Sequence, residues 1–225
     1  MKIVHPNIEQ HIVIEPGTIN LLVIEDAGSF YKFVREFADQ CVGNPGRFVL
    51  SDGNQILEMR GNVSIVTSPF DFDCNQRHII NSVKSNLIRI AKEENHYSET
   101  VELTSNIDRY LLGLVSSFDL PSVSMELGEY EIDALIKNSE IAIRSDSESL
   151  SENLIEYMSL LRELMGAAVF VFVNLKTFLA KDELDALYEM AIYRELHLLL
   201  LENSESRYKH EAERQILIDA DLCEI

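Results

Sequence analysis

The sequence predicts an α/β fold whose mostly parallel sheet is interrupted by an inserted α-helical segment. Three continuous apolar runs, typical of strands buried on both faces, indicate the sheet: Leu21–Ile24, Val169–Val173 and Leu198–Leu201. Strand patterns are missing between residues 71 and 139, where helical periodicity dominates. We therefore expect an α/β head formed by residues 1–70 and 140–225, with residues 71–139 inserted as a helical leg.

The first part of the head begins with two short strands, Ile12–Ile14 and Ile19–Ile24, around the turn residues Pro16 and Gly17. A helix follows, because apolar residues recur at helical spacing from Phe30 to Cys41 before the glycine-rich stop at residues 43–46. Strands are then expected at Arg47–Leu50 and Val63–Thr67, separated by a turn at residues 51–54.

The leg is expected to start with a capping box formed by Asp73 and Gln76, and its first helix to run to about Glu94. A second helix is predicted from Glu99 to Ser117. Its inner side would carry Ile107, Leu111, Leu114 and Val115. Two long consecutive helices favour an antiparallel hairpin, and a brief helix ending near Lys137 should follow.

The second part of the head is expected to start with a strand at Ile141–Arg144 and a helix capped by Ser149. The buried strand at 169–173, a helix around Leu184–Ile192 and the strand at 198–201 form a βαβ pattern, which implies a parallel pair. A last strand is predicted at Gln215–Ile218.

The composition restricts the classes of function. The 225 residues carry a formal charge of −19 and are 46% hydrophobic, so the chain can bury a real core but repels a polyanion over most of its surface. A nucleic-acid site would need a concave or enclosed cationic surface. No segment is long and apolar enough to predict a signal peptide or membrane span, and Cys41, Cys74 and Cys223 lack metal-ligand spacing. We expect a cytoplasmic protein with reduced thiols and no membrane partner.

One segment reverses the sign of the charge. Residues 74–92 contain no Asp or Glu, and their basic residues share one broad face of the predicted helix. Surface helices usually alternate signs to form i,i+4 pairs, so a solvated face explains the polarity but not the missing acids. We expect this face to contact phosphates of a duplex rather than stacked single-stranded bases, because no aromatic residue is interleaved. The candidates are Arg77, Lys84, Arg89 and Lys92, with Lys137 and Arg144 as weaker ones.

Nucleotide and catalytic sites find less support. The turn after the first long strand, residues 26–32, has one glycine and no Gly-Lys-Ser/Thr, so Asp26 and Ser29 are interpreted as helix-start residues. Asp71 and Asp73 could hold Mg²⁺ in a nuclease, but no neighbouring residues complete such a site. The histidines are scattered, and no Gly-x-Ser-x-Gly elbow occurs.

An acidic segment follows the predicted second leg helix. It contains Asp119, Glu126, Glu129, Glu131 and Asp133. Several oxygen ligands on one segment suit Ca²⁺, although the spacing is not that of an EF-hand and a solvated acidic loop would have the same composition.

The order of elements and several segments resemble the DNA-end-binding adaptation protein of type II-A CRISPR loci. The resemblance extends over nearly the whole chain and depends on order and spacing rather than on one motif. It is carried by Leu21–Phe30, Phe72–Asn75, Phe172–Glu183, Leu199–Glu202 and Gln215–Asp219.

The resemblance implies a head like a phosphate-loop ATPase core without the phosphate loop, and a leg inserted into it. It further implies a homotetrameric ring, supported by Ca²⁺, whose basic inner wall binds double-stranded DNA from free ends without sequence preference. Such a protein acts in spacer acquisition beside other adaptation and effector proteins of the locus and has no established catalytic activity. By this analogy the basic face lines the hole, and Asp119, Glu126, Glu129 and Glu131 are the calcium candidates.

Two alternatives stay open at this point. A protein-interaction module with an ATPase-like fold could use the same basic face to bind an acidic partner protein. A metal-dependent nuclease or nucleotide hydrolase would need a site that the sequence does not assemble.

Overall fold

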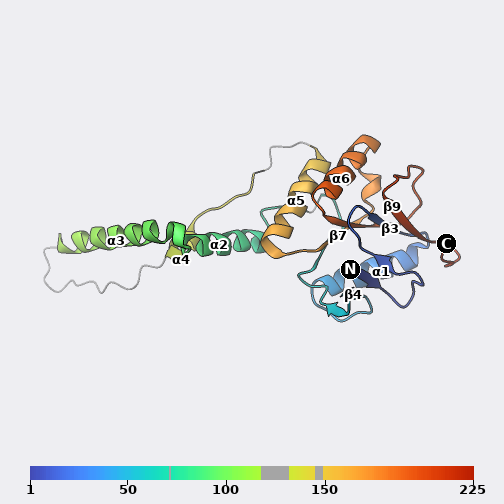
Figure 1. Cartoon of the computed structure of the whole chain (residues 1–225), viewed down its shortest axis with the longest axis horizontal. Coiled ribbons are helices and arrows are strands. Elements are labelled where there is room, and N and C mark those ends of the chain that lie inside the picture. The colour runs from blue at the N-terminus through green and yellow to red at the C-terminus, as the bar shows by residue number, and fades with distance from the viewer. Residues whose placement is uncertain (71, 118–131, 145–148) are drawn as a thin grey trace. The chain divides into compact units, whose positions relative to one another are not determined.

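The computed structural model describes residues 1–70, 72–117, 132–144 and 149–225 (Figure 1). The chain divides into two compact units, one made of Met1–Asp73 with Ser145–Ile225 and the other of Cys74–Arg144. We call them the head and the leg. The predicted limits of the leg were residues 71 and 139, so the observed leg keeps five more residues at its C-terminal end.

The head contains a five-stranded parallel sheet in the order β6-β7-β8-β3-β9. Its strands are β3 (Ile19–Ile24), β6 (Val63–Val66), β7 (Val169–Val173), β8 (His197–Glu202) and β9 (Glu213–Ile218). All residues of β3 and β7 are buried, which explains why these strands read as continuous apolar runs rather than alternating ones. The predicted α/β class with a mostly parallel sheet is confirmed.

Helices cover this sheet, with α1 (Ala27–Cys41) on one side and α5 (Leu150–Met165) and α6 (Lys181–Tyr193) together on the other (Figure 1). Leu154, Met158 and Leu161 form the buried side of α5. The helix ends at Gly166, whose φ of 71° is a left-handed value that glycine adopts without strain. A short 3₁₀ turn, η1 (Leu175–Thr177), joins β7 to α6.

A second, antiparallel sheet in the order β2-β1-β4-β5 belongs to the head. It contains β1 (Lys2–Val4), β2 (Ile12–Val13), β4 (Val49–Asp52) and β5 (Gln55–Leu57). His5, Phe33, Phe37 and Phe48 pack with ring centroids 4.4–4.9 Å apart and join this part of the head to α1. Burial lowers the pKa of His5, which therefore behaves as a neutral aromatic residue of the core.

The leg contains α2 (Arg77–Ala91), α3 (Glu94–Ser116) and α4 (Ile132–Asn138). The predicted capping box is wrong, because α2 begins after Gln76 and that residue makes no side-chain cap bond. The predicted hairpin of the two long helices is also wrong. Figure 1 shows α3 running on from the end of α2 instead of turning back beside it. The expected strand at Ile141–Arg144 is not a strand but irregular chain that belongs to the leg, so the head resumes later than predicted.

A buried polar network joins η1, α6 and β9. Lys176 Nζ lies 2.6 Å from Glu213 Oε1, and the two side chains are 6% and 4% exposed. The hydroxyl of Tyr188 donates to the same carboxylate oxygen at 2.8 Å, and Lys176 also donates to the carbonyl of Tyr208 at 3.1 Å. Nearby, burial raises the pKa of Glu202 to about 7, although its carboxylate accepts the backbone N–H of Lys176 at 3.1 Å.

We predict that Lys176→Met destabilises the head by about 3 kcal/mol, because Glu213 would keep a buried charge without its cation. The free energy of unfolding in urea measures the loss. Arg214→Met is the matched control, since the Arg214–Glu15 pair is 49% and 54% exposed and should contribute below about 1 kcal/mol. Equal losses in the two variants would contradict the assigned role of the buried pair.

Candidate nucleic-acid interface

The leg is held together by an outgoing and a returning stretch of chain. Asn75 pairs its side-chain amide with the peptide groups of Ile143, donating to the carbonyl at 2.9 Å and accepting from the N–H at 2.8 Å. Further out, Lys84 Nζ donates to the carbonyl of Lys137 at 2.8 Å. Lys92 Nζ lies 2.8 Å from Asp133 Oδ1. The paired residues are 75 with 143, 84 with 137 and 92 with 133. Since the second number falls as the first rises, α4 and residues 139–144 run antiparallel to α2.

This arrangement brings the predicted basic residues together. Arg77 is the first residue of α2 and is exposed, and Arg144 follows the residue that pairs with Asn75. Lys84 and Lys137 meet on neighbouring helices. All six candidates therefore lie in α2, at its C-cap or in the chain that returns beside it, namely Arg77, Lys84, Arg89, Lys92, Lys137 and Arg144.

Two of these cations already have carboxylate partners. Arg89 pairs with Glu93 one turn further along, and Lys92 pairs with Asp133, whose side chain is only 17% exposed. The hydrogen bond from Lys92 lowers the pKa of the Asp133 carboxyl and keeps it ionised. The side chains of Arg89 and Lys92 nevertheless stay 64% and 55% exposed.

The apolar side of α2 matches the sequence prediction in part. Ile79 is fully buried, and Ile80 and Val83 are partly buried. Leu87 and Ile90 stay 39% and 37% exposed. A hollow of about 350 Å³ lies where α2, α3 and α4 meet, and it is lined by Leu87, Ile90, Ala91, His96, Glu99, Thr100, Leu103 and Ile136. Thr100 Oγ1 donates to the carbonyl of Ala91 at 2.8 Å and fixes the start of α3 to the end of α2.

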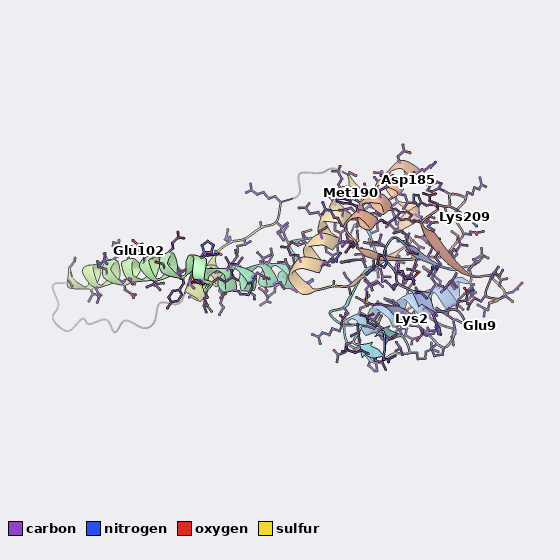
Figure 2. All side chains as sticks on the ribbon, viewed as in Figure 1. Lys2, Glu9, Glu102, Asp185, Met190 and Lys209 are labelled. Atoms are coloured by element: carbon purple, nitrogen blue, oxygen red, sulfur yellow. The ribbon has the colours of Figure 1, made fainter. Side chains whose placement is uncertain are left out.

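Helix α3 has exposed apolar side chains, which its sequence pattern did not predict. None of its residues is buried, and Figure 2 shows its side chains, Glu102 among them, projecting away from the ribbon. The large hydrophobic residues more than 40% exposed are Tyr97, Val101, Leu103, Tyr110, Leu112 and Leu114. Leu114, predicted on an inner side, is 48% exposed.

These side chains occupy two sides of α3. At about 100° per residue, Leu103, Tyr110 and Leu114 share one side, while Val101 and Leu112 lie about 160° away. A helix that is apolar on two opposite sides is typical of one that packs between neighbours. The hairpin was predicted because α2 and α3 are two long consecutive helices. Most apolar residues of α3, however, do not pack against α2.

The expected calcium ligands Asp119, Glu126, Glu129 and Glu131 lie outside the described residues, as does Asp71 of the nuclease alternative. Among the residues that the structure does describe, no three acidic, histidine or cysteine side chains gather into a metal site. Asp133, the one member of the acidic cluster in the described part, is paired with Lys92.

The turn after β3 also behaves as the sequence predicted. Asp26 is the N-cap of α1, and its Oδ2 accepts the backbone N–H of Ser29 at 2.7 Å. That bond lowers the pKa of Asp26, so a carboxylate occupies the end of the helix that a nucleotide phosphate would need. In the part of the chain described, no helix has the length and apolar character of a membrane span.

Comparison with known proteins identifies the family. The model of the family described as CRISPR-associated protein (Cas_Csn2) matches residues 40–222. The chain belongs to the Csn2 family of CRISPR-associated proteins. The CRISPR-associated protein Csn2 of Streptococcus agalactiae is 26% identical over 206 residues, which cover 90% of this chain and 89% of that protein.

A comparison of folds finds a solved structure from Pyrococcus furiosus, a putative ABC transporter ATP-binding protein. It is 9% identical to this chain, with a TM-score of 0.41, and the match covers 96% of this chain and 97% of that one.

We predict that Asn75→Ala loosens the returning chain of the leg. The N–H of Ile143 would lose its acceptor, and because one hydrogen bond contributes about 1 kcal/mol, its exchange with deuterium should become roughly fivefold faster. Hydrogen exchange of residues 139–144 measures the change. Asn86→Ala is the control, because the Asn86 amide bonds within α2, where its Nδ2 donates to the carbonyl of Ser82 and its Oδ1 accepts from Arg89. Unchanged exchange at Ile143 in Asn75→Ala would contradict the pairing.

Proposed function

We propose that this Csn2-family protein is a non-catalytic binder of double-stranded DNA that acts, as a homotetrameric ring, during acquisition of new CRISPR spacers. The observation that carries the DNA part is the gathering of Arg77, Lys84, Lys92, Lys137 and Arg144 on the paired segments of the leg, in a chain of formal charge −19. Phosphate contacts from Lys and Arg give affinity without sequence preference.

The charge of the chain supports an assembly rather than a monomer on DNA. A few cations on one leg contact few phosphates, while the rest of the molecule repels the duplex. Four legs around one duplex would multiply the contacts and turn the acidic faces outward. If each chain neutralises about two phosphates, log K should fall against log salt with a slope of roughly −7.

The exposed apolar side chains of α3 support self-association. Tyr110 is 67% exposed and Leu103 48%, and apolar patches of this kind on a helix mark interaction surfaces. Apolar residues on two sides of α3 would let each helix pack against more than one neighbour. The proposed ring therefore uses α3 for assembly and the basic face of α2 with α4 for DNA.

Calcium, the further adaptation and effector proteins as partners, and a cytoplasmic site of action complete the proposal. The first two come from the family resemblance, together with the acidic composition of residues 119–131. The three free cysteines suit a reducing compartment, where the DNA of the locus lies. Ca²⁺ would be held by carboxylates of residues 119–131 and would offset their mutual repulsion.

A gel-shift titration tests the DNA part. We expect linear duplex to bind and closed circular duplex of the same sequence to bind much more weakly, because a closed ring admits DNA only through an end. Changing Lys84, Arg89 and Lys92 together to Ala should weaken binding to linear duplex by at least about tenfold at physiological salt, since phosphate contacts dominate affinity.

The matched control removes three exposed cations from the head, by changing Lys32, Arg35 and Arg207 to Ala. It alters net charge equally and should change affinity by about twofold or less. Equal binding of circular and linear duplex would refute threading, and equal losses in the two triple variants would refute the assignment of the leg. Binding of an acidic partner protein with none of DNA would favour the interaction-module alternative.

A second prediction concerns assembly. Replacing Leu103 and Tyr110 together by Glu should convert the tetramer to smaller species, because carboxylates cannot be buried between helices without a partner. Sedimentation in calcium and in a chelator gives the masses. The control variant, Ser105→Glu with Asn106→Glu, adds equal charge at exposed polar positions of α3 and should remain tetrameric in calcium. A wild-type monomer in both buffers would contradict the ring.

A further inference from the structure

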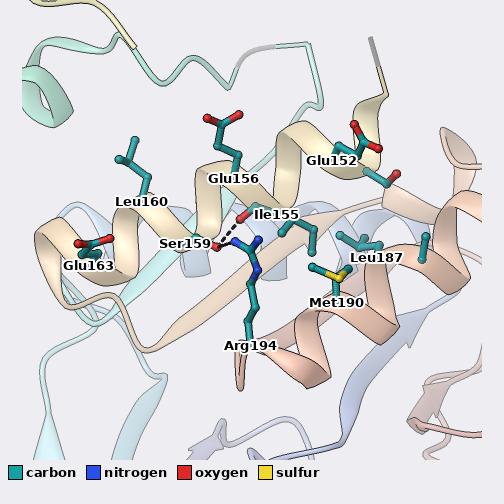
Figure 3. Close-up of a pocket in the computed structure, with 11 residues that line it drawn as sticks. Glu152, Ile155, Glu156, Ser159, Leu160, Glu163, Leu187, Met190 and Arg194 are labelled. Atoms are coloured by element: carbon teal, nitrogen blue, oxygen red, sulfur yellow. Dashed lines mark hydrogen bonds between the residues drawn. The ribbon is translucent and has the colours of Figure 1, made fainter. Parts of the chain in front are cut away.

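The head has an apolar groove that the proposed DNA binding does not use. It lies between α5 and α6, measures about 620 Å³, and is one of the larger hollows of the molecule (Figure 3). Its floor is formed by Ile155 of α5 and Leu187 of α6, which are 6% and 0% exposed, and Ala186 of α6 also lines it. Leu160 of α5 and Met190 of α6 also line the groove, and Met190 is 37% exposed.

The rim of the groove is acidic along one side. Glu152, Glu156 and Glu163 project from α5 beside the apolar floor (Figure 3). At about 100° per residue the three carboxylates fall within roughly 40° of each other, so they form one acidic row along the helix. Glu156 and Glu163 are two turns apart, about 10 Å along the axis at 1.5 Å per residue.

Among the described residues that line the groove, the one cation, Arg194, already has hydrogen-bond partners. Arg194 Nη1 donates to Ser159 Oγ at 2.7 Å, and Ser159 donates to the carbonyl of Ile155 at 2.7 Å. Arg162 donates to the carbonyls of Arg194 and Glu195 at 2.7 and 2.8 Å and fixes the end of α6. The groove is therefore preformed by bonds between its two helices, and its three carboxylates outnumber its single guanidinium.

We infer that this groove docks a basic amphipathic helix of a partner protein. Two helices with an apolar floor between them fit the apolar side of a third helix, which enters such grooves with anchors at i, i+3 or i+4 and i+7. Lys or Arg residues two turns apart on that helix would face Glu156 and Glu163. Met190 is an adaptable side chain at the wall, and methionines of this kind line surfaces that accept helices.

Charge complementarity selects this occupant over others. A helix rich in Lys and Arg is attracted by the row on α5 and by the chain as a whole, whose formal charge is −19. A nucleic acid is repelled by the same row. The groove is on the head, whereas the proposed DNA and assembly surfaces are on the leg, so the inference does not depend on the proposed function.

The test uses the full chain and a synthetic helical peptide of about 16 residues, with Leu along one side and Lys at i and i+7 on its edge. Fluorescence anisotropy of the labelled peptide gives the affinity at physiological salt. A second peptide of identical composition, rearranged so that Leu and Lys do not segregate on a helix, is the peptide control. We expect saturable binding of the first peptide and at least about tenfold weaker binding of the second, a difference of about 1.4 kcal/mol.

The protein variant that tests the acidic row is Glu156→Lys with Glu163→Lys. Both residues are exposed, and circular dichroism checks that the head stays folded. Affinity for the segregated peptide should fall at least about tenfold. The matched control, Glu211→Lys with Asp221→Lys, reverses two exposed acids elsewhere on the head and should change affinity by about twofold or less.

Four results would overturn the inference. Equal binding of the two peptides, or equal losses in the two variants, would mean general attraction to an acidic surface rather than docking. Absence of saturable binding would remove the groove as a helix site. A smaller sedimenting mass of the Glu156→Lys, Glu163→Lys protein alone, beside an unchanged control variant, would assign the groove to a second copy of this chain instead.

Discussion

The return of the chain along α2 is the constraint on which the rest of the leg depends. Asn75 bonds to both peptide groups of Ile143, and Lys92 bonds to Asp133 at the far end of the paired stretch. Because α4 takes the place beside α2, α3 is left to extend on its own with apolar side chains in solvent. The same pairing collects the basic residues of both segments. One set of contacts thus creates both surfaces that the proposed ring would use.

The acidity of the chain restricts where DNA can bind. With 38 acidic and 19 basic residues, the molecule opposes any polyanion except where its cations are concentrated and its acids face elsewhere. Association through α3 would supply that geometry by placing several basic legs around one duplex. The head contributes differently, since its acidic groove attracts cationic surfaces and repels DNA. A basic partner helix at the groove and DNA at the leg are therefore expected to bind on separate units.

The sequence predicted the head well and the leg only in part. Buried parallel strands such as Val169–Val173 are continuous apolar runs, and the helix between them has clear periodicity, so the βαβ order could be read directly. Helix α2 and the short α4 were also predictable. The helix that packs on α2 could not be predicted. Periodicity shows that α3 is amphipathic, but it cannot show that α4, a helix of only seven residues, is the one that packs on α2. The segment 141–144 has the apolar alternation of a strand, yet Asn75 supplies bonds that a neighbouring strand would otherwise give.

We propose that several copies of this Csn2-family chain surround one duplex through their legs. Native mass spectrometry of the protein with a short linear duplex and calcium measures the number of chains per DNA. We expect complexes of four chains with one duplex, and the loss of these complexes when Leu103 and Tyr110 are both replaced by Glu. Complexes of one chain per duplex, or four-chain complexes that persist in that variant, would contradict it.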